Sequence, residues 1–213
     1  MDNVKGHLII IGGAEDKTGE RTILKRAAKM LGKDDTLTVL TTATEQPEKA
    51  GKDYSEVFSA LGVKNIRVLN IDTRDDADDE KNSDIIKKSK CVFMTGGDQL
   101  RITSILGGTR AGGELKKRYE SGGLIVGTSA GASVMSSTMV VQGNDNEPAS
   151  KCTLKMAPGL GILSGVIIDQ HFDQRGRFGR LLCGVAENPD VLGLGIDENT
   201  AVMLYPDMHF EII

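Results

Sequence analysis

A serine set between glycines is the first feature of this sequence that points to chemistry. Gly127-Thr128-Ser129-Ala130-Gly131 fits the G-x-S-x-G pattern, between an apolar run at 124–127 and a helix-compatible run at 132–138. Glycines relieve side-chain crowding in a sharp turn, so the hydroxyl can be exposed at its tip. A following helix directs N–H groups at the reacting centre, and the Ala130 N–H is placed to stabilise an oxyanion. The pattern predicts a nucleophile; an incidental serine or a phosphate-binding turn are the alternatives.

A serine hydroxyl needs a neighbouring general base, most often a histidine. The sequence holds three histidines. His7 begins the first strand-like run, at its amino end, and His209 lies among the last residues. His171 ends a strand-like run, at the carboxyl edge where Ser129 is also expected. By elimination, His171 is the predicted base.

The base needs an acid that fixes its tautomer and stabilises the imidazolium. The candidates are Asp169, Asp173, Asp197 and Glu198. The first two lie too close to His171 along the chain to reach the outer imidazole nitrogen easily. The last two lie in a predicted turn that can fold back over the site. The residues themselves leave the choice between these two open.

Three arginines follow the predicted base closely: Arg175, Arg177 and Arg180. Guanidinium groups bind carboxylates with paired hydrogen bonds, so this cluster favours an acidic substrate, with a solvated basic helix face as the alternative. Gln99, with the backbone of Gly96 and Gly97, is a candidate for a second oxyanion donor or a substrate contact. The alternative for Gln99 is the start of a helix after a glycine turn.

The elements that must position these residues are apolar runs that alternate with helical patterns. The predicted strands are 7–11, 37–42, 66–71, 91–95 and 124–127. The helix-like segments are 21–31, 54–61, 84–89 and 113–120. This alternation predicts a mostly parallel sheet with helices on both faces, and ligands bind at the carboxyl ends of such strands. A further strand at 166–172 and a hairpin over 192–213, turning at 197–199, complete the prediction.

Length and composition fit a single α/β hydrolytic domain over residues 1–213. The 39% of hydrophobic and 26% of charged residues are typical of a globular protein, and a net charge of −4 argues against general nucleic-acid binding. No run approaches the roughly 18 apolar residues that span a bilayer, and the first residues do not resemble a signal peptide. Together with three cysteines that lack metal-like spacing, these features predict a reduced, cytoplasmic protein without a membrane partner.

Together these motifs resemble the cyanophycinases, in the serine peptidase family that also holds the α-aspartyl dipeptidases. The resemblance covers the whole chain, and its segments are 12–17, 95–99, 127–132, 169–172 and 195–201. The segment Asp169-Gln170-His171-Phe172 with its trailing arginines separates this subgroup from the dipeptidases, whose nucleophile turn is similar. Family members usually continue past the position of Ile213, a difference that concerns the sheet edge and the dimer, whereas the triad positions all precede it.

The resemblance implies a triad of Ser129, His171 and Glu198, and so selects Glu198 over Asp197. We expect the oxyanion to be held by the N–H groups of Ala130 and Gly97. The substrate pocket that the resemblance implies is formed by Gln99, Asp169, Gln170, Arg175, Arg177 and Arg180. The expected fold is a three-layer α/β sandwich of the class I glutamine amidotransferase-like or flavodoxin-like type, with the nucleophile on a strand–turn–helix elbow.

The implied substrate is cyanophycin, a poly-aspartate with arginine on each β-carboxyl, from which such exopeptidases release β-Asp-Arg from the chain end. Its end unit carries two free carboxylates, which the arginine cluster would clamp. A carboxylate for the substrate guanidinium is also expected, and Asp169 or Asp173 is the hypothesis. The resemblance further implies a homodimer without metal or cofactor.

Three alternatives stay open. The first is an aspartyl dipeptidase or related exopeptidase with the same triad, against which the segment 169–172 argues. The second is a glutaminase-like amidotransferase domain, but such sites normally carry a cysteine where this chain has Ser129. The third is a non-catalytic binding module, against which the complete triad argues.

Overall fold

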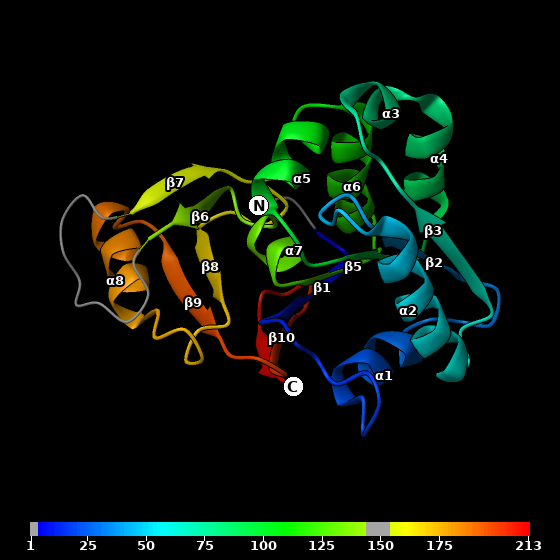
Figure 1. The fold of residues 1–213 in the computed structure, drawn as a ribbon, viewed down its shortest axis with the longest axis horizontal. Coiled ribbons are helices and arrows are strands. Elements are labelled where there is room, and N and C mark those ends of the chain that lie inside the picture. The colour runs from blue at the N-terminus through cyan, green and yellow to red at the C-terminus, as the bar shows by residue number, and fades with distance from the viewer. Residues whose placement is uncertain (1–3, 144–153) are drawn as a thin grey trace.

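A seven-stranded sheet forms the centre of the protein, whose computed structural model describes residues 4–143 and 154–213 (Figure 1). The strand order is β11-β10-β1-β5-β4-β2-β3. The strands are β1 (His7–Ile11), β2 (Thr36–Leu40), β3 (Asn65–Leu69), β4 (Cys91–Met94), β5 (Leu124–Thr128), β10 (Ala201–Leu204) and β11 (Phe210–Ile212). Strands β1 to β5 run parallel to one another, whereas β10 is antiparallel to both β1 and β11. The predicted mostly parallel α/β sheet is confirmed.

Helices cover both faces of this sheet. They are α1 (Thr22–Lys29), α2 (Pro47–Ala60), α3 (Arg74–Asp78), α4 (Glu80–Lys88), α5 (Gln99–Leu106) and α6 (Arg110–Glu120). Successive residues of a strand point to opposite faces. Accordingly, Ile9 packs with Leu24 of α1 on one face, while Ile10 packs with Leu115 of α6 on the other. The two apolar layers hold the carboxyl ends of the strands at one edge.

Two smaller sheets and a helix form a side lobe, drawn at the left of Figure 1. They are β6 (Thr138–Gln142), β7 (Lys155–Pro158), β8 (Val166–Gln170), α8 (Phe178–Glu187) and β9 (Leu192–Ile196). β6 pairs with β7 in antiparallel fashion, and β8 pairs with β9 in parallel. Val140, Ile167 and Leu181 form the apolar centre of this lobe. The lobe presents the end of β8 to the main sheet.

Several predicted elements are wrong. The hairpin over 192–213 does not form, because β9 pairs with β8 in the lobe whereas β10 pairs with β1 and β11. Residues 197–199 therefore cross between two sheets. The helix after Ser129, α7 (Ala130–Ser133), ends before the predicted 138, and α2 begins at Pro47 instead of residue 54. Helix α5 begins at Gln99, which agrees with the alternative interpretation of that residue, whereas the pair β6–β7 was not predicted. Within the described ranges, no helix has both the length and the apolar character to cross a bilayer.

Candidate active site

Ser129 stands at the tip of a tight turn between β5 and α7. Its φ of 53° and ψ of −111° are rare for a residue with a side chain. Its N–H donates to the carbonyl of Ile11 at 3.0 Å, which fixes the turn to the end of β1. A Cβ atom at Gly127 would lie 2.3 Å from the carbonyl oxygen of Gly131, so the first glycine of the pattern permits the close approach of strand and helix. The local sequence therefore builds a strained elbow.

The Ser129 hydroxyl lies 3.0 Å from Nε2 of His171. His171 follows β8 directly, with a φ of 47°. Its backbone N–H donates to the carbonyl of Gly12 at 2.8 Å, so the histidine is tied to the end of β1 although it comes from the side lobe. His171 is thus within hydrogen-bond reach of the serine proton.

The other imidazole nitrogen of His171, Nδ1, lies 2.6 Å from Oε1 of Glu198. The N–H of Glu198 donates to the side-chain oxygen of Gln174 at 2.8 Å. The competing carboxylate, Asp197, instead accepts the backbone N–H of Asp173 at 2.9 Å. The structure therefore brings Glu198, not Asp197, to the histidine. Gln174 was not predicted, and no pattern in the sequence distinguishes it.

Backbone hydrogen bonds from two glycines hold these parts together. The N–H of Gly12 donates to the carbonyl of Thr200 at 3.0 Å, and the carbonyl of Gly13 accepts the N–H of Asn199 at 2.9 Å. A Cβ atom at Gly12 would lie 2.1 Å from the carbonyl oxygen of Asp197. The chain at residues 197–200 can therefore pass close to the end of β1 only because position 12 has no side chain.

Of the two predicted oxyanion donors, Ala130 lies at the elbow and Gly97 lies in the turn after β4. Ala130 is the first residue of α7, so its N–H has no acceptor within the helix. Gly97 follows β4 with a φ of 147°, and a Cβ atom there would lie 2.1 Å from the carbonyl oxygen of Ala43. The neighbouring Gly96 lies against the nucleophile, because a Cβ atom on it would be 3.4 Å from the Cβ of Ser129. Both turns thus adjoin the serine.

A buried carboxylate beneath the elbow, Glu15, links three elements. Its side chain accepts hydrogen bonds from the hydroxyls of Thr128, at 2.5 Å, and Tyr54. Burial raises the pKa of Tyr54, and the charge of Glu15 raises it further, so this phenol stays protonated. Glu15 therefore joins the loop after β1 to the end of β5 and to α2. Sequence reasoning assigned it no role, although it lies in the glycine-rich segment 12–17.

The predicted substrate residues form a network behind His171. Asp169 is 1% exposed. Its Oδ2 accepts from Nε of Arg180 at 2.7 Å, and its Oδ1 pairs with the same guanidinium group. The same Oδ1 lies 3.5 Å from Nη1 of Arg177. That Nη1 also donates to the carbonyl and side-chain oxygens of Gln170, at 2.6 and 3.1 Å. The structure therefore brings four of the six predicted pocket residues together.

The other two pocket residues lie apart from this network. Arg175 is exposed, while the amide of Gln99 donates to the carbonyl of Val140 in β6 at 3.3 Å. The proposed acid for the substrate guanidinium remains a hypothesis. Both oxygens of Asp169 already accept from Arg180, and Asp173 is exposed. In the described ranges, no three His, Cys, Asp or Glu side chains gather as metal ligands.

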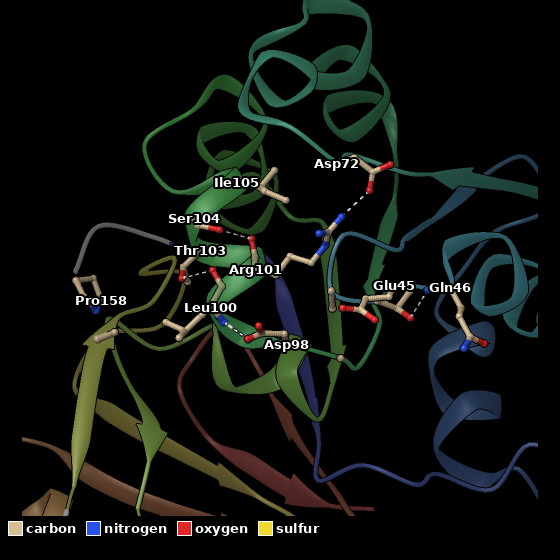
Figure 2. A pocket seen from close by; sticks show the side chains of 14 residues that line it. Glu45, Gln46, Asp72, Asp98, Leu100, Arg101, Thr103, Ser104, Ile105 and Pro158 are labelled. Atoms are coloured by element: carbon tan, nitrogen blue, oxygen red, sulfur yellow. Dashed lines mark hydrogen bonds and ion pairs between the residues drawn. The ribbon is translucent and has the colours of Figure 1, made fainter.

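A cavity of about 1040 Å³ is lined by Gly97 and by residues of α5 (Figure 2). Figure 2 shows Asp98 and Arg101 from the start of α5, facing Glu45 from the loop before α2. Arg101 donates to Asp72 and to the carbonyl of Thr42, at 2.8 and 2.9 Å. Ser129 does not line this cavity, so it adjoins the triad instead of containing it.

Comparison with known proteins matches this chain to one family of peptidases. The model of peptidase family S51 matches residues 8–212. A cyanophycinase of Geminocystis herdmanii is 36% identical over 99% of this chain and 78% of its own length. A cyanophycinase of Thermosynechococcus vestitus is 37% identical over 95% of this chain and 64% of its own length. These relatives are therefore longer than the present chain.

Two solved structures share the fold. A peptidase from an acI-B1 actinobacterium aligns with a TM-score of 0.73 at 22% identity, over 99% of this chain and 88% of that one. A putative peptidase E protein from Listeria monocytogenes aligns with a TM-score of 0.67 at 15% identity, over 98% of each chain. At these identities the likeness concerns the fold alone.

Proposed function

This chain belongs to peptidase family S51, and from that membership we propose that it is a cyanophycinase, an exopeptidase that releases β-Asp-Arg dipeptides from cyanophycin. The family and the curated relatives make it a serine-type peptidase. Their name favours this substrate over that of the aspartyl dipeptidases. The observation that carries the proposal is the continuous contact from Ser129 through His171 to Glu198.

In the proposed mechanism, Ser129 attacks a backbone carbonyl of the polymer. His171 Nε2, 3.0 Å away, accepts the hydroxyl proton, and Glu198 at Nδ1 keeps the tautomer that leaves Nε2 free to do so. The N–H groups of Ala130 and Gly97 stabilise the oxyanion. The intermediate collapses as His171 protonates the leaving amine, and water then hydrolyses the acyl-enzyme.

Guanidinium groups support the proposed pocket. Arg175, Arg177 and Arg180 carry three of them on one short segment. An end unit of cyanophycin carries two free carboxylates, and guanidinium groups bind carboxylates with paired hydrogen bonds. Because Arg177 and Arg180 are buried, the network would hold its shape before substrate arrives. Gln99 and Gln170 supply the uncharged contacts in this proposal.

The resemblance also leads us to propose a homodimer that acts in the cytoplasm. Light scattering of the purified protein would give the mass of the assembly. A particle of one chain's mass at micromolar concentration would contradict the dimer. Fractionation of the source cells would test the location independently.

The function is tested by incubating the purified protein with insoluble cyanophycin. Clearing of the suspension is followed by light scattering, and the products are identified by mass. We expect β-Asp-Arg from the wild type and none from Ser129→Ala, whose circular dichroism should be unchanged. A folded wild type that releases no dipeptide would refute the proposed substrate.

A further inference from the structure

A second, smaller cavity of about 290 Å³ lies beside the nucleophile, on the α2 side of the sheet. Its walls include Lys17, Lys49, Thr95 and Gly96. Gly96 is the residue whose Cβ position lies 3.4 Å from the Cβ of Ser129. A group bound here would therefore be close to the bond that is cleaved.

Two lysines give the cavity its positive charge. The ammonium of Lys17 lies 4.2 Å over the ring of Tyr54 and 3.9 Å from Oε1 of Glu15, and its side chain is 38% exposed. An ammonium group has three N–H donors, so the contact of Lys17 with Glu15 leaves donors for a ligand. Lys49 is exposed and has no ion-pair partner within the described residues. Both ammonium groups can thus reach a ligand.

The first turn of α2 also lines the cavity, and no side chain caps it. Gln46 occupies the N-cap position without a side-chain hydrogen bond, and Pro47 follows. The next N–H groups, of Glu48 and Lys49, have no acceptor within the helix. The positive end of this 14-residue helix therefore lies at the wall of the cavity, which Gln46 and Lys49 line.

The hydroxyl of Thr95 is an independent sign of a missing ligand. Thr95 is 2% exposed, and its Oγ1 has no hydrogen-bond partner in the described part of the chain. A buried polar group without a partner is costly, and native proteins seldom keep one without reason. Thr95 lines the cavity, so a carboxylate bound there would accept from the lysines, and from this hydroxyl once the Thr95 side chain turns toward the cavity.

We propose that this cavity binds a free carboxylate of the polymer unit adjacent to the one whose carbonyl Ser129 attacks. The inference rests on the proposed function, because every unit of cyanophycin carries a free carboxylate on its arginine. Asp53, exposed on α2, also lines the cavity. A site that holds both signs of charge suits a zwitterionic unit better than a simple anion.

Steady-state kinetics on a soluble oligomer of β-Asp-Arg units tests this subsite. We expect KM to rise about tenfold in Lys17→Gln and in Lys49→Gln, with kcat changed less than about twofold. An oligomer whose arginine carboxylates are amidated should be cleaved equally by the wild type and both variants. Lys52→Gln is the matched control, because Lys52 lies on the same helix and pairs with Glu56 outside the cavity. An unchanged KM in both cavity variants would overturn the proposal.

Thr95→Val separates ligand binding from folding. The substitution removes an unpaired buried hydroxyl, so the thermal midpoint should stay the same or rise, while KM for the oligomer rises severalfold. An unchanged KM would contradict the role of Thr95.

A binding measurement distinguishes failure of the proposed function from failure of the subsite. If the wild type released no β-Asp-Arg, binding of the same oligomer would be measured by calorimetry. Weaker binding to Lys17→Gln than to Lys52→Gln would support the subsite. Equal binding to both, or none to the wild type, would refute it.

Discussion

The imidazole of His171 lies directly against the α-carbon of Gly13. A Cβ atom at position 13 would come within 2.4 Å of the ring carbon Cε1 and 2.5 Å of Nε2. Gly13 also has a φ of 109°, a conformation that residues with side chains rarely adopt. The place of the proposed base is thus set by a missing side chain in the loop after β1.

Gly13→Ala should displace the imidazole and disable the enzyme. We expect kcat to fall by about a hundredfold or more, because a shift of about 1 Å already costs that much. Gly62→Ala is the matched control, since Gly62 has a φ of 92° but nothing within 4 Å of its Cβ position. Both variants share the backbone strain, and only the first contains the clash. Equal kcat in the two variants would contradict the role of this contact.

Glu198→Gln should reduce kcat on the order of a thousandfold while the protein stays folded. The amide cannot stabilise the imidazolium and can hold the wrong tautomer of His171. Asp197→Asn should cost less than about tenfold, because that carboxylate accepts a backbone N–H from Asp173. Turnover of the polymer by both variants shows whether Glu198 or Asp197 is the acid of the triad. A larger loss in Asp197→Asn would move the acid to Asp197.

Asp169→Ala should destabilise the fold by about 3–5 kcal/mol, because it leaves buried guanidinium charge without its carboxylate. Urea unfolding of the variant gives the change. Asp84→Ala removes an exposed partner of Lys88 and should cost less than about 1 kcal/mol. Equal losses would mean that the buried pair is no stronger than a surface one.

Asp16→Asn should make stability depend differently on pH. Backbone N–H groups of Arg21, Gly19 and Thr18 donate to Asp16 and lower its pKa to about 2. Because the folded pKa lies below its ordinary value of 3.8, the stabilisation is present at neutral pH and is lost as the pH falls through about 2. The difference in thermal midpoint between wild type and variant should therefore be largest above pH 5 and shrink towards pH 2. A difference that is constant over this range would contradict the assignment.

The central sheet was predictable because its strands are short apolar runs between glycine turns. The run at 7–11 became β1 with the predicted bounds, and 124–127 became β5 with one further residue. Their carboxyl ends were expected to meet at one edge, and the structure brings Ser129 and His171 together there. Periodicity and turn chemistry suffice for this part.

Strand pairing beyond that sheet could not be predicted. Glycines alternate with apolar residues at 193 and 195, a pattern that predicts a hairpin strand. In the structure Gly195 packs against the ring of Phe172, because a Cβ atom at position 195 would lie 2.6 Å from that ring. Local sequence does not say which of two sheets a strand joins. Helix α5 was only the alternative interpretation of Gln99, because Ile102, Thr103 and Ile105 are β-branched. Packing of α5 in the core outweighs their weak helix propensity.

The proposed triad is divided between two sheets. Ser129 follows β5 of the large sheet, whereas His171 and Glu198 follow β8 and β9 of the small parallel pair. The rate of turnover therefore reports whether the two sheets remain in contact. On gradual warming, the rate should fall before the helical circular dichroism signal does. An inhibitor that contacts both sheets should raise the temperature at which activity is lost.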